Sequence, residues 1–239
     1  LSGGLAYGQQ WSQLGSSLAG EAAFDNAGQS VAMSEDGLTV IIGAPGNDGS
    51  FNGAGQARVY TYSGSDWVQK GADIDGEAQY DGSGSSVAMS ANGDIVAIGA
   101  TGNSSSAGHV RIFEWSGSAW TQKGSDIDGE SSSDQSGFSV DMSGSGMVLV
   151  IGSPKNDDGG SDAGQVRVYE WDGSDWVQRG VDLNGTAGDN FGHAVAIDSS
   201  GLIIAVGSPL KSGPSTNCGA VRTYIWNSTT WTAFGAVSY

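Results

Sequence analysis

The sequence predicts an all-β fold, a β-propeller of about four four-stranded blades that forms either a whole ring or a part of a larger one. Tryptophan recurs at a fixed interval, four strand patterns recur within each interval, and 41 glycines supply the backbone conformations of tight turns. We expect a single propeller domain over residues 1–239, with repeats at approximately 16–71, 72–124, 125–180 and 181–235. Residues 1–15 are expected to be the remnant of a further blade.

The tryptophan period is the main signal. Consecutive copies are separated by 56, 53, 56 and 55 residues, and the copies are Trp11, Trp67, Trp120, Trp176 and Trp231. The first four begin a W-x-Q-x-G segment, and the last has lost its glutamine. Such a period is typical of supersecondary units that stack or surround an axis. Before the first copy, Leu5–Tyr7 resembles the end of another third strand, and Trp11 opens another outer strand. This spare copy indicates either a truncated larger ring or an extra edge strand.

Each repeat opens with a hairpin. Its first strand is short and alternating, as in Ser86–Ser90, and a turn with Asn-Gly or a related pair follows. The second strand, as in Ile95–Gly99, is apolar at every position, which predicts burial on both faces. The third strand alternates again, as in Gln165–Trp171, and the W-x-Q-x-G segment is the outermost strand. Four antiparallel strands with a buried middle describe a propeller blade.

Glycine motifs flank each inner hairpin and carry a resemblance to a known family. The residues before it are Phe191-Gly192 and, at the same place in other repeats, Gly28, Gly84 and Gly137; those after it are Gly43–Pro45, Gly99–Thr101, Gly152–Pro154 and Gly207–Pro209. Over about residues 11–235 the chain resembles FG-GAP repeat proteins, the family of the integrin alpha-subunit head. The resemblance implies a propeller, an extracellular or cell-surface location, and adhesion or ligand binding on one face. The family's calcium loop is not matched, because hairpin turns such as Ser34–Gly37 are short and poor in carboxylates.

The charge of the chain restricts its partners. The formal net charge is −17, which disfavours nucleic acid and anionic membranes and favours cations, basic partners or simple solubility. No apolar stretch is long enough to span a membrane. Cys218 is the only cysteine and excludes an internal disulfide. The chain begins with Leu1, which favours a processed product or a part of a longer protein.

Repeated carboxylates between the outer strand and the next repeat are candidate calcium ligands. Oxygen ligands at relative positions 1, 3, 5 and 9 suit a cation that takes six to eight oxygens. The candidates are Asp73, Asp75, Glu77 and Asp81 in one copy and Asp126, Asp128, Glu130 and Asp134 in the next. The alternative is that Asp and Gly form Asx turns in these loops and cap backbone amides.

Arginine repeats in a way that indicates a structural role between blades. One arginine occupies the same place in each third strand, beside aromatic residues, and the four are Arg58, Arg111, Arg167 and Arg222. We expect each guanidinium to stack on an aromatic ring and to pair with a repeated aspartate, respectively Asp25, Asp81, Asp134 and Asp189. A ligand-binding role for the arginines is the alternative.

The loops after the second strands differ most between repeats, and variable loops on a rigid scaffold are where recognition usually lies. In a propeller these loops share a face with the crossovers, and the candidate ligand-face residues are Asn47, Asp48, Asn156, Asp157, Asp158 and Asp162. A solvated acidic surface is the alternative. Three sequons, at Asn103, Asn184 and Asn227, permit glycosylation, and Asn103 is expected to be the most accessible.

Enzymatic chemistry is not indicated. The two histidines, His109 and His193, occupy unrelated repeat positions, and we interpret both as ordinary strand or loop residues. The sequence therefore predicts a non-catalytic, extracellular adhesion or ligand-binding module that recognises a protein, a glycan or cations through its acidic loops. The alternative function is a structural subunit of an extracellular assembly that self-associates through an exposed blade edge. The competing idea of a hydrolase would require clustered groups with shifted pKa values in a central channel.

Overall fold

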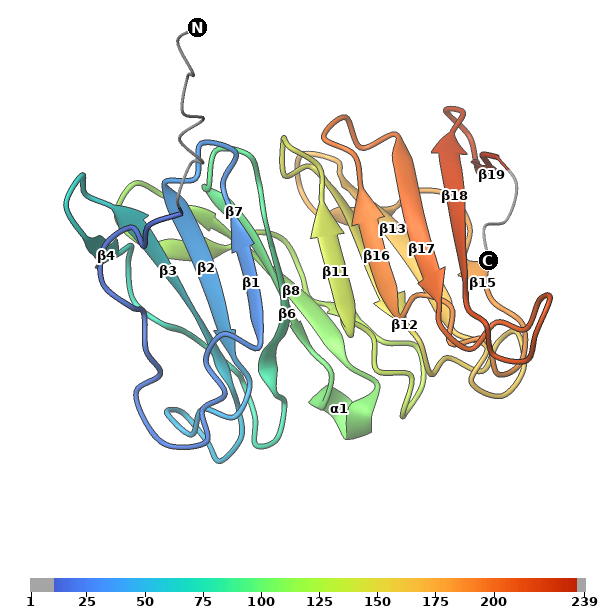
Figure 1. Cartoon of the computed structure of the whole chain (residues 1–239), viewed down its shortest axis with the longest axis horizontal. Helices are drawn as coiled ribbons and strands as arrows, with labels where there is room; N and C mark the ends of the chain where they lie inside the picture. The colour runs from blue at the N-terminus through green and yellow to red at the C-terminus, as the bar shows by residue number, and fades with distance from the viewer. Residues whose placement is uncertain (1–10, 236–239) are drawn as a thin grey trace, which may run out of the picture.

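The computed structural model describes residues 11–235, which form four antiparallel sheets in chain order (Figure 1). Blade 1 contains β1 (Ser30–Met33), β2 (Thr39–Ala44), β3 (Gln56–Tyr62), β4 (Trp67–Gln69) and β5 (Ile74–Asp75); blade 2 contains β6 (Ser83–Met89), β7 (Ile95–Ala100), β8 (His109–Trp115), β9 (Trp120–Gln122) and β10 (Ile127–Asp128). Blade 3 contains β11 (Ser139–Met142), β12 (Val148–Ser153), β13 (Gln165–Trp171), β14 (Trp176–Gln178) and β15 (Leu183–Asn184); blade 4 contains β16 (Ala194–Ile197), β17 (Ile203–Ser208), β18 (Ala220–Trp226) and β19 (Trp231–Ala233).

Each blade has the predicted order of four strands, from a short inner strand to the outer tryptophan strand. Three blades add a two-residue strand, which follows the outer strand and pairs with the start of the third, as Ile74 does with Ala57. A short helical turn, α1 (Asn103–Ser106), lies in the loop between β7 and β8. The all-β fold is thus confirmed, with the four-bladed arrangement of a β-propeller. Figure 1 shows the four sheets as a fan, with blade 1 and blade 4 at its opposite ends.

The hydrophobic core consists of three layers between consecutive blades. Ile41 and Val59 of blade 1 pack against Val96 and Ile98 of blade 2 in the first layer. Alternate residues of β7 and of β12 face opposite neighbours, so both strands are buried at every position, as the continuous apolar patterns predicted. Ile74 belongs to the first layer, where it fills the space beneath its crossover.

A glycine contact aligns each blade with the next one. The carbonyl oxygen of Gly192, at the start of blade 4, accepts a hydrogen bond of 2.8 Å from Ser139 Oγ of blade 3 and lies against Gly152. A Cβ on Gly152 would overlap this carbonyl, so only glycine permits the approach. Equivalent contacts join the earlier blades, through Ser30 Oγ to Gly84 O and Ser86 Oγ to Gly137 O, both at 2.7 Å.

Blade 4 presents the same apolar pattern on a partly exposed face. Residues on one side of β17 are half-buried, whereas those on the other side, such as Ile204 and Val206, are fully buried in the third layer. Gly207 has ordinary space around a Cβ, and its nearest neighbour would be Ala194 at 3.5 Å. A hollow of about 400 Å³ lies here, with Pro209 and Val221 in its lining.

Residues 14–16 lie against blade 1 as the end of an outer strand lies against the following blade. Trp67 Nε1 donates to Leu14 O at 2.8 Å, and Ser16 N donates to Asp66 Oδ1 at 2.7 Å. The same two bonds recur between blade 2 and blade 3, from Trp176 Nε1 to Lys123 O and from Ser125 N to Asp175 Oδ1. The predicted strand end at residues 5–7 falls outside the described residues.

Candidate functional site

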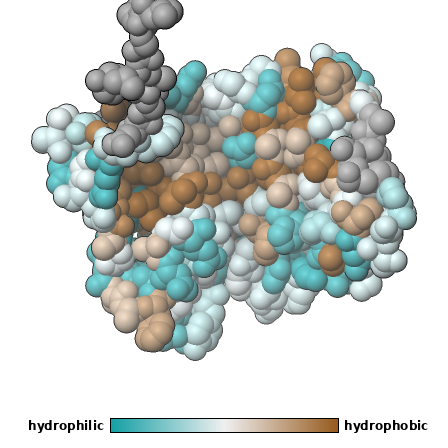
Figure 2. Space-filling model, viewed as in Figure 1, coloured by the Kyte–Doolittle hydropathy of each residue, from teal (hydrophilic) through white to brown (hydrophobic). Residues whose placement is uncertain are grey.

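The loops after the second strands and the crossovers between blades lie along one edge of the fan, the lower edge in Figure 1. We call this edge the loop face and define it by residues 19–29, 45–55, 72–82, 101–108, 125–138, 154–164, 181–193 and 209–219. Sixteen of the chain's 26 acidic residues fall in these segments: Glu21, Asp25, Asp48, Asp73, Asp75, Glu77, Asp81, Asp126, Asp128, Glu130, Asp134, Asp157, Asp158, Asp162, Asp182 and Asp189. Figure 2 shows a mostly hydrophilic lower edge beneath hydrophobic strands.

The four repeated aspartates are buried and cap their own crossovers. Asp81 Oδ2 accepts hydrogen bonds from the backbone N–H groups of Glu77 and Ala78, and Asp25 Oδ2 does the same for Glu21 and Ala22. Asp134 and Asp189 bond to the backbone N–H three residues earlier. Each aspartate therefore fixes the conformation of one turn of the loop face.

The arginines contact the preceding crossover, as an inter-blade role requires. Arg111 of blade 2 donates Nη2–H to Asp75 O, which lies in β5 of blade 1, and its guanidinium stacks 5.4 Å from the centre of the Phe113 ring. Arg167 makes the equivalent bond to Asp128 O at 2.7 Å.

The predicted arginine–aspartate pairs form in blade 4 only, where Arg222 Nη2 lies 3.8 Å from Asp189 Oδ2. In the other blades the guanidinium pairs with a glutamate four residues before the aspartate: Arg58–Glu21 at 3.6 Å, Arg111–Glu77 at 3.3 Å and Arg167–Glu130 at 3.9 Å. The prediction was wrong for these three because the aspartate is turned back onto its own loop, while the longer glutamate reaches the arginine.

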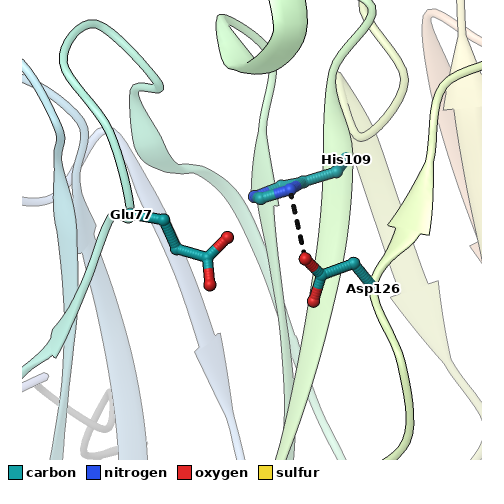
Figure 3. A group of neighbouring side chains, drawn as sticks. All are labelled: Glu77, His109 and Asp126. Atoms are coloured by element: carbon teal, nitrogen blue, oxygen red, sulfur yellow. Dashed lines mark ion pairs between the residues drawn. The ribbon is translucent and has the colours of Figure 1, made fainter.

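The first residue of the third strand extends this network in blades 1 and 3. Gln56 Nε2 donates to Glu21 Oε2 at 3.0 Å, and Gln165 Nε2 donates to Glu130 Oε2 at 2.9 Å. In blade 2 this residue is His109, which lies between Glu77 and Asp126 (Figure 3). Its Nδ1 is 3.9 Å from Asp126 Oδ2.

Burial controls the charge of His109, whose side chain is 2% exposed. Burial lowers the pKa of His109 and the nearby Arg111 lowers it further, while Asp126, Glu77 and Asp81 act in the opposite direction. The imidazole is therefore neutral at neutral pH. In blade 1, burial raises the pKa of the Asp75 carboxyl, and the negative charges of Asp73 and Glu21 add to this effect.

The structure groups the predicted calcium ligands differently from the linear pattern. Within residues 11–235, carboxylate and imidazole ligand atoms converge in two sets, Glu77–His109–Asp126 and Glu130–Asp158–Asp182, and the ligand atoms of each set lie within 4.8 Å of one another. Each set combines consecutive crossovers. Asp81 and Asp134 are not members, since both cap backbone amides, and Asp73 Oδ1 accepts a hydrogen bond from Gln69 Nε2 at 2.6 Å.

The candidate ligand-face residues divide into two groups. Asp48, Asp157 and Asp158 are exposed and Asp162 is half-exposed. Asn47 and Asn156 are buried instead, because their Nδ2 groups donate to Asp25 and Asp134, respectively. They support the loop face from within rather than forming its surface.

The sequons also differ from the expected order of accessibility. Asn103 is half-buried, and its Nδ2 approaches Asp81 Oδ1 at 3.4 Å, so the expectation that it is the most accessible was wrong. Asn184 and Asn227 are exposed. The two histidines belong to different blades, and His193 is exposed and packs on Phe138 with ring centres 4.8 Å apart.

Sequence reasoning missed a second row of cations, on the opposite edge of the fan. The residue three after each outer-strand tryptophan is basic in three repeats, and its charge lies over the tryptophan pair of the next blade. Lys123 Nζ is 4.3 Å from the ring centre of Trp171, and Arg179 Cζ is 4.8 Å from that of Trp226. The recurring basic residue in W-x-Q-[KR]-G was the available signal.

Comparison with known protein families agrees with this repeat. The sequence model of the FG-GAP repeat family matches residues 11–62 and 122–169. The comparison with curated proteins found no match. Among the described residues, no helix has the length and apolar character that a membrane crossing requires.

Solved structures share the fold at low sequence identity. A putative 6-phosphogluconolactonase from Bacteroides uniformis matches with a TM-score of 0.57 and 12% identity, over 87% of this chain and 54% of that one. Kuenenia stuttgartiensis hydrazine synthase matches with 0.58 and 10%, over 93% and 52%. A complex of KlAtg21 with the coiled coil of AgAtg16 matches with 0.59 and 9%, over 86% and 56%. The chain thus spans about half of the length of these structures, and the likeness concerns the fold alone.

Proposed function

We propose that this chain is a non-catalytic recognition module that binds a cationic partner through the loop face. The chain belongs to the FG-GAP repeat family. The observation that carries the proposal is the concentration of acidic residues on variable loops that buried aspartates and arginines hold in place. Such loops on a rigid scaffold are suited to recognition, because little ordering entropy is lost on binding.

The charge of the loop face supports a basic protein surface as the partner. The segments of the loop face contain 16 acidic residues and two lysines, Lys155 and Lys211, each of which pairs with an aspartate. The arginines that face the same edge are mostly buried and engaged. Exposed carboxylates such as Asp48, Asp157 and Asp158 are left to attract cations.

An extracellular or cell-surface location is part of the proposal. FG-GAP repeats are typical of extracellular proteins, and exposed sequons at Asn184 and Asn227 are compatible with glycosylation. Adhesion or ligand binding, rather than catalysis, fits a loop face on which the two histidines occupy different blades and the variable loops carry carboxylates.

A charge-neutralising pair of variants tests the proposal. Asp157→Asn with Asp158→Asn retains the acceptor oxygens that bond to Asp162 N and Gln165 Nε2 while removing two exposed charges. Binding of the chain to an immobilised oligolysine peptide is measured at low and at physiological ionic strength. We expect the variant to bind about tenfold more weakly at low salt, because each surface charge pair contributes up to about 1 kcal/mol.

The matched control is Glu35→Gln with Asp36→Asn, which removes two adjacent exposed charges in the inner hairpin turn of blade 1, at the opposite edge of the blades. Equal losses in the two variants would show a general charge effect without a recognition face, and would refute the proposed function. Circular dichroism of both variants confirms that the fold is retained.

A second candidate function, a structural subunit that self-associates, is favoured by the ends of the fan. Gly28, which is equivalent to the glycines that dock on the preceding blade, has open space around it and is exposed. Gly207 and the hollow beside it are equivalent to the position that receives such a glycine. The blade 1 end of one copy is thus shaped to dock on the blade 4 face of another.

Sedimentation over a range of chain concentrations tests this second candidate. Self-association through these ends predicts a rising weight-average mass that Gly207→Leu suppresses, because the side chain would fill the hollow. A chain that stays monomeric at all concentrations argues for the recognition module instead.

A further inference from the structure

The ring nitrogens of His109 lack the hydrogen bonds that a buried imidazole normally makes. The glutamines at the equivalent positions, Gln56 and Gln165, both donate to a glutamate of the loop face. In contrast, His109 Nε2 is fully buried and has no hydrogen-bond partner within residues 11–235. The 3.9 Å between Nδ1 and Asp126 Oδ2 is too long for a hydrogen bond. Neither ring nitrogen therefore has a hydrogen-bond partner within residues 11–235, and because a buried polar group without a partner costs free energy, a ligand at either nitrogen would be favourable.

Two carboxylates are oriented toward the imidazole by other side chains. Gln122 Nε2 donates to Asp126 Oδ1 at 2.6 Å, and Oδ2 of the same carboxylate faces His109. Arg111 Nη1 lies 3.3 Å from Glu77 Oε1, which holds the glutamate beside the ring while leaving it a second oxygen. Figure 3 shows the three side chains converging from two crossovers and from β8. Such outer contacts are typical of metal-binding residues.

The spacing of the three ligand atoms suits a small cation. One atom from each of Glu77, His109 and Asp126 lies within 4.8 Å of the others. Tetrahedral zinc with bonds of about 2.0–2.2 Å to nitrogen or oxygen holds neighbouring ligand atoms about 3.4 Å apart. The 3.9 Å between Nδ1 and Asp126 Oδ2 is slightly longer than this, so side-chain rotations of Asp126 and of the exposed Glu77 would complete the set.

We propose that Glu77, His109 and Asp126 bind a divalent transition-metal ion of the zinc class, with water at the remaining position. One imidazole nitrogen and two carboxylates form a three-residue set that zinc accepts, whereas calcium takes oxygen ligands. This ion would join the crossover of blade 1 to the third strand and crossover of blade 2, which goes beyond the partner recognition proposed above.

The chain itself offers the fold-preserving variant, because glutamine occupies the position of His109 in blades 1 and 3. Metal-free chain and His109→Gln are titrated with Zn²⁺ by calorimetry and with Co²⁺ by visible absorption. We expect one tight ion per wild-type chain and at least about tenfold weaker binding in the variant, since even supporting residues of metal sites contribute about 10–100-fold. An unchanged Zn²⁺ affinity in His109→Gln overturns the proposal.

Two further measurements address the ligand set. Asp126→Asn keeps an acceptor for Gln122 and is expected to weaken Zn²⁺ binding as His109→Gln does; full affinity in this variant contradicts the assignment of Asp126. Excess Ca²⁺ is expected to leave the Co²⁺ spectrum unchanged. Displacement of Co²⁺ by Ca²⁺ at comparable concentrations overturns the proposal in favour of an oxygen-only site.

The equivalent site in blade 3 provides a gain-of-function test. Glu130, Asp158 and Asp182 have ligand atoms within 4.8 Å of one another, but Gln165 stands in the place of the imidazole. Gln165→His is expected to raise the stoichiometry to two Zn²⁺ ions per chain. An unchanged stoichiometry in a folded variant would contradict the deciding role given to the imidazole.

Discussion

The three interior junctions and the outer face of blade 4 derive from the same repeat, yet they differ in what covers them. At the interior junctions a serine donates to a glycine carbonyl of the following blade, and that carbonyl lies against a glycine of the second strand. On blade 4 the serine is replaced by Ala194 and the glycine, Gly207, has room around it. Blade docking thus depends on backbone contact at one point, and the apolar strands around it supply the buried area.

The largest effect is expected from adding one methyl group at an interior glycine. Gly152→Ala places a Cβ onto the carbonyl oxygen of Gly192, so blades 3 and 4 must separate. Overpacking in a core typically costs 1–3 kcal/mol, and with a backbone atom as the obstacle we expect about 3 kcal/mol or more. Thermal and urea unfolding measure the loss.

Gly207→Ala is the matched control, because it makes the same change at the equivalent place of blade 4. Its Cβ would meet Ala194 at 3.5 Å, an ordinary contact. We expect a change within about 0.5 kcal/mol, as for most surface substitutions. Similar losses at Gly152 and Gly207, measured at low chain concentration, would break the comparison, since the glycine contact would then not distinguish the two regions.

The tryptophans extend the comparison to the outer strands. Trp176 is buried and donates Nε1–H to Lys123 O at 2.8 Å, whereas Trp11 is fully exposed, at 102% of its reference area. Trp176→Phe leaves a buried carbonyl without its donor, and the expected loss is about 1–3 kcal/mol. Trp11→Phe should change the free energy of unfolding by less than about 0.5 kcal/mol. Chemical denaturation ranks the two single variants. Equal effects would refute the claim that the buried Trp176 stabilises the fold more than the exposed Trp11 does.

A smaller effect is expected at the serine of the junction. Ser139→Ala removes the hydroxyl that donates to Gly192 O and reproduces the alanine of blade 4, so the loss should be about 1 kcal/mol. The reverse change, Ala194→Ser, adds a hydroxyl on a partly exposed face where water already serves as partner, and no gain is expected in the monomer. A stabilisation by Ala194→Ser would show that the face is covered in solution.

Much of the fold follows from the sequence, because the signals are local and repeated. Alternation, hairpin turns and the apolar second strand determine the order of strands in each blade. Burial on both faces was predicted for every second strand, but in β17 only alternate residues are fully buried. That difference arises from tertiary packing, because the second face of a strand is buried only where another blade lies against it. The strand β7 has the same apolar pattern and is buried throughout.

The candidate site was less predictable, because several carboxylates share one period. Glu77 and Asp81 both recur with the arginine, so spacing did not decide which of them pairs with Arg111. The choice depends on side-chain reach and on the backbone amides that Asp81 caps. His109 was interpreted as an ordinary residue, although alignment of the repeats shows glutamine at two of its three equivalent positions. The set of Glu77, His109 and Asp126 combines residues of consecutive crossovers with β8, and it needed the folded structure.

The last prediction concerns Asp141, a carboxylate at the junction of blades 3 and 4. The other repeats have alanine at the equivalent position. Burial raises the pKa of Asp141, while hydrogen bonds from Ile197 N and Met142 N oppose the rise. With a folded pKa above the unfolded value near 4, the stability that this group contributes is complete at lower pH and is lost as pH rises through the folded pKa.

Asp141→Ala should therefore flatten the pH dependence of unfolding above about pH 4. At neutral pH its net effect should stay within about 1 kcal/mol, because loss of the bond to Ile197 N offsets relief of the buried charge. Urea titrations of wild type and variant from pH 4 to pH 7 measure the difference. A wild-type chain that gains stability over this range relative to Asp141→Ala would mean that the two hydrogen bonds outweigh burial, and that this junction is strengthened by its charge.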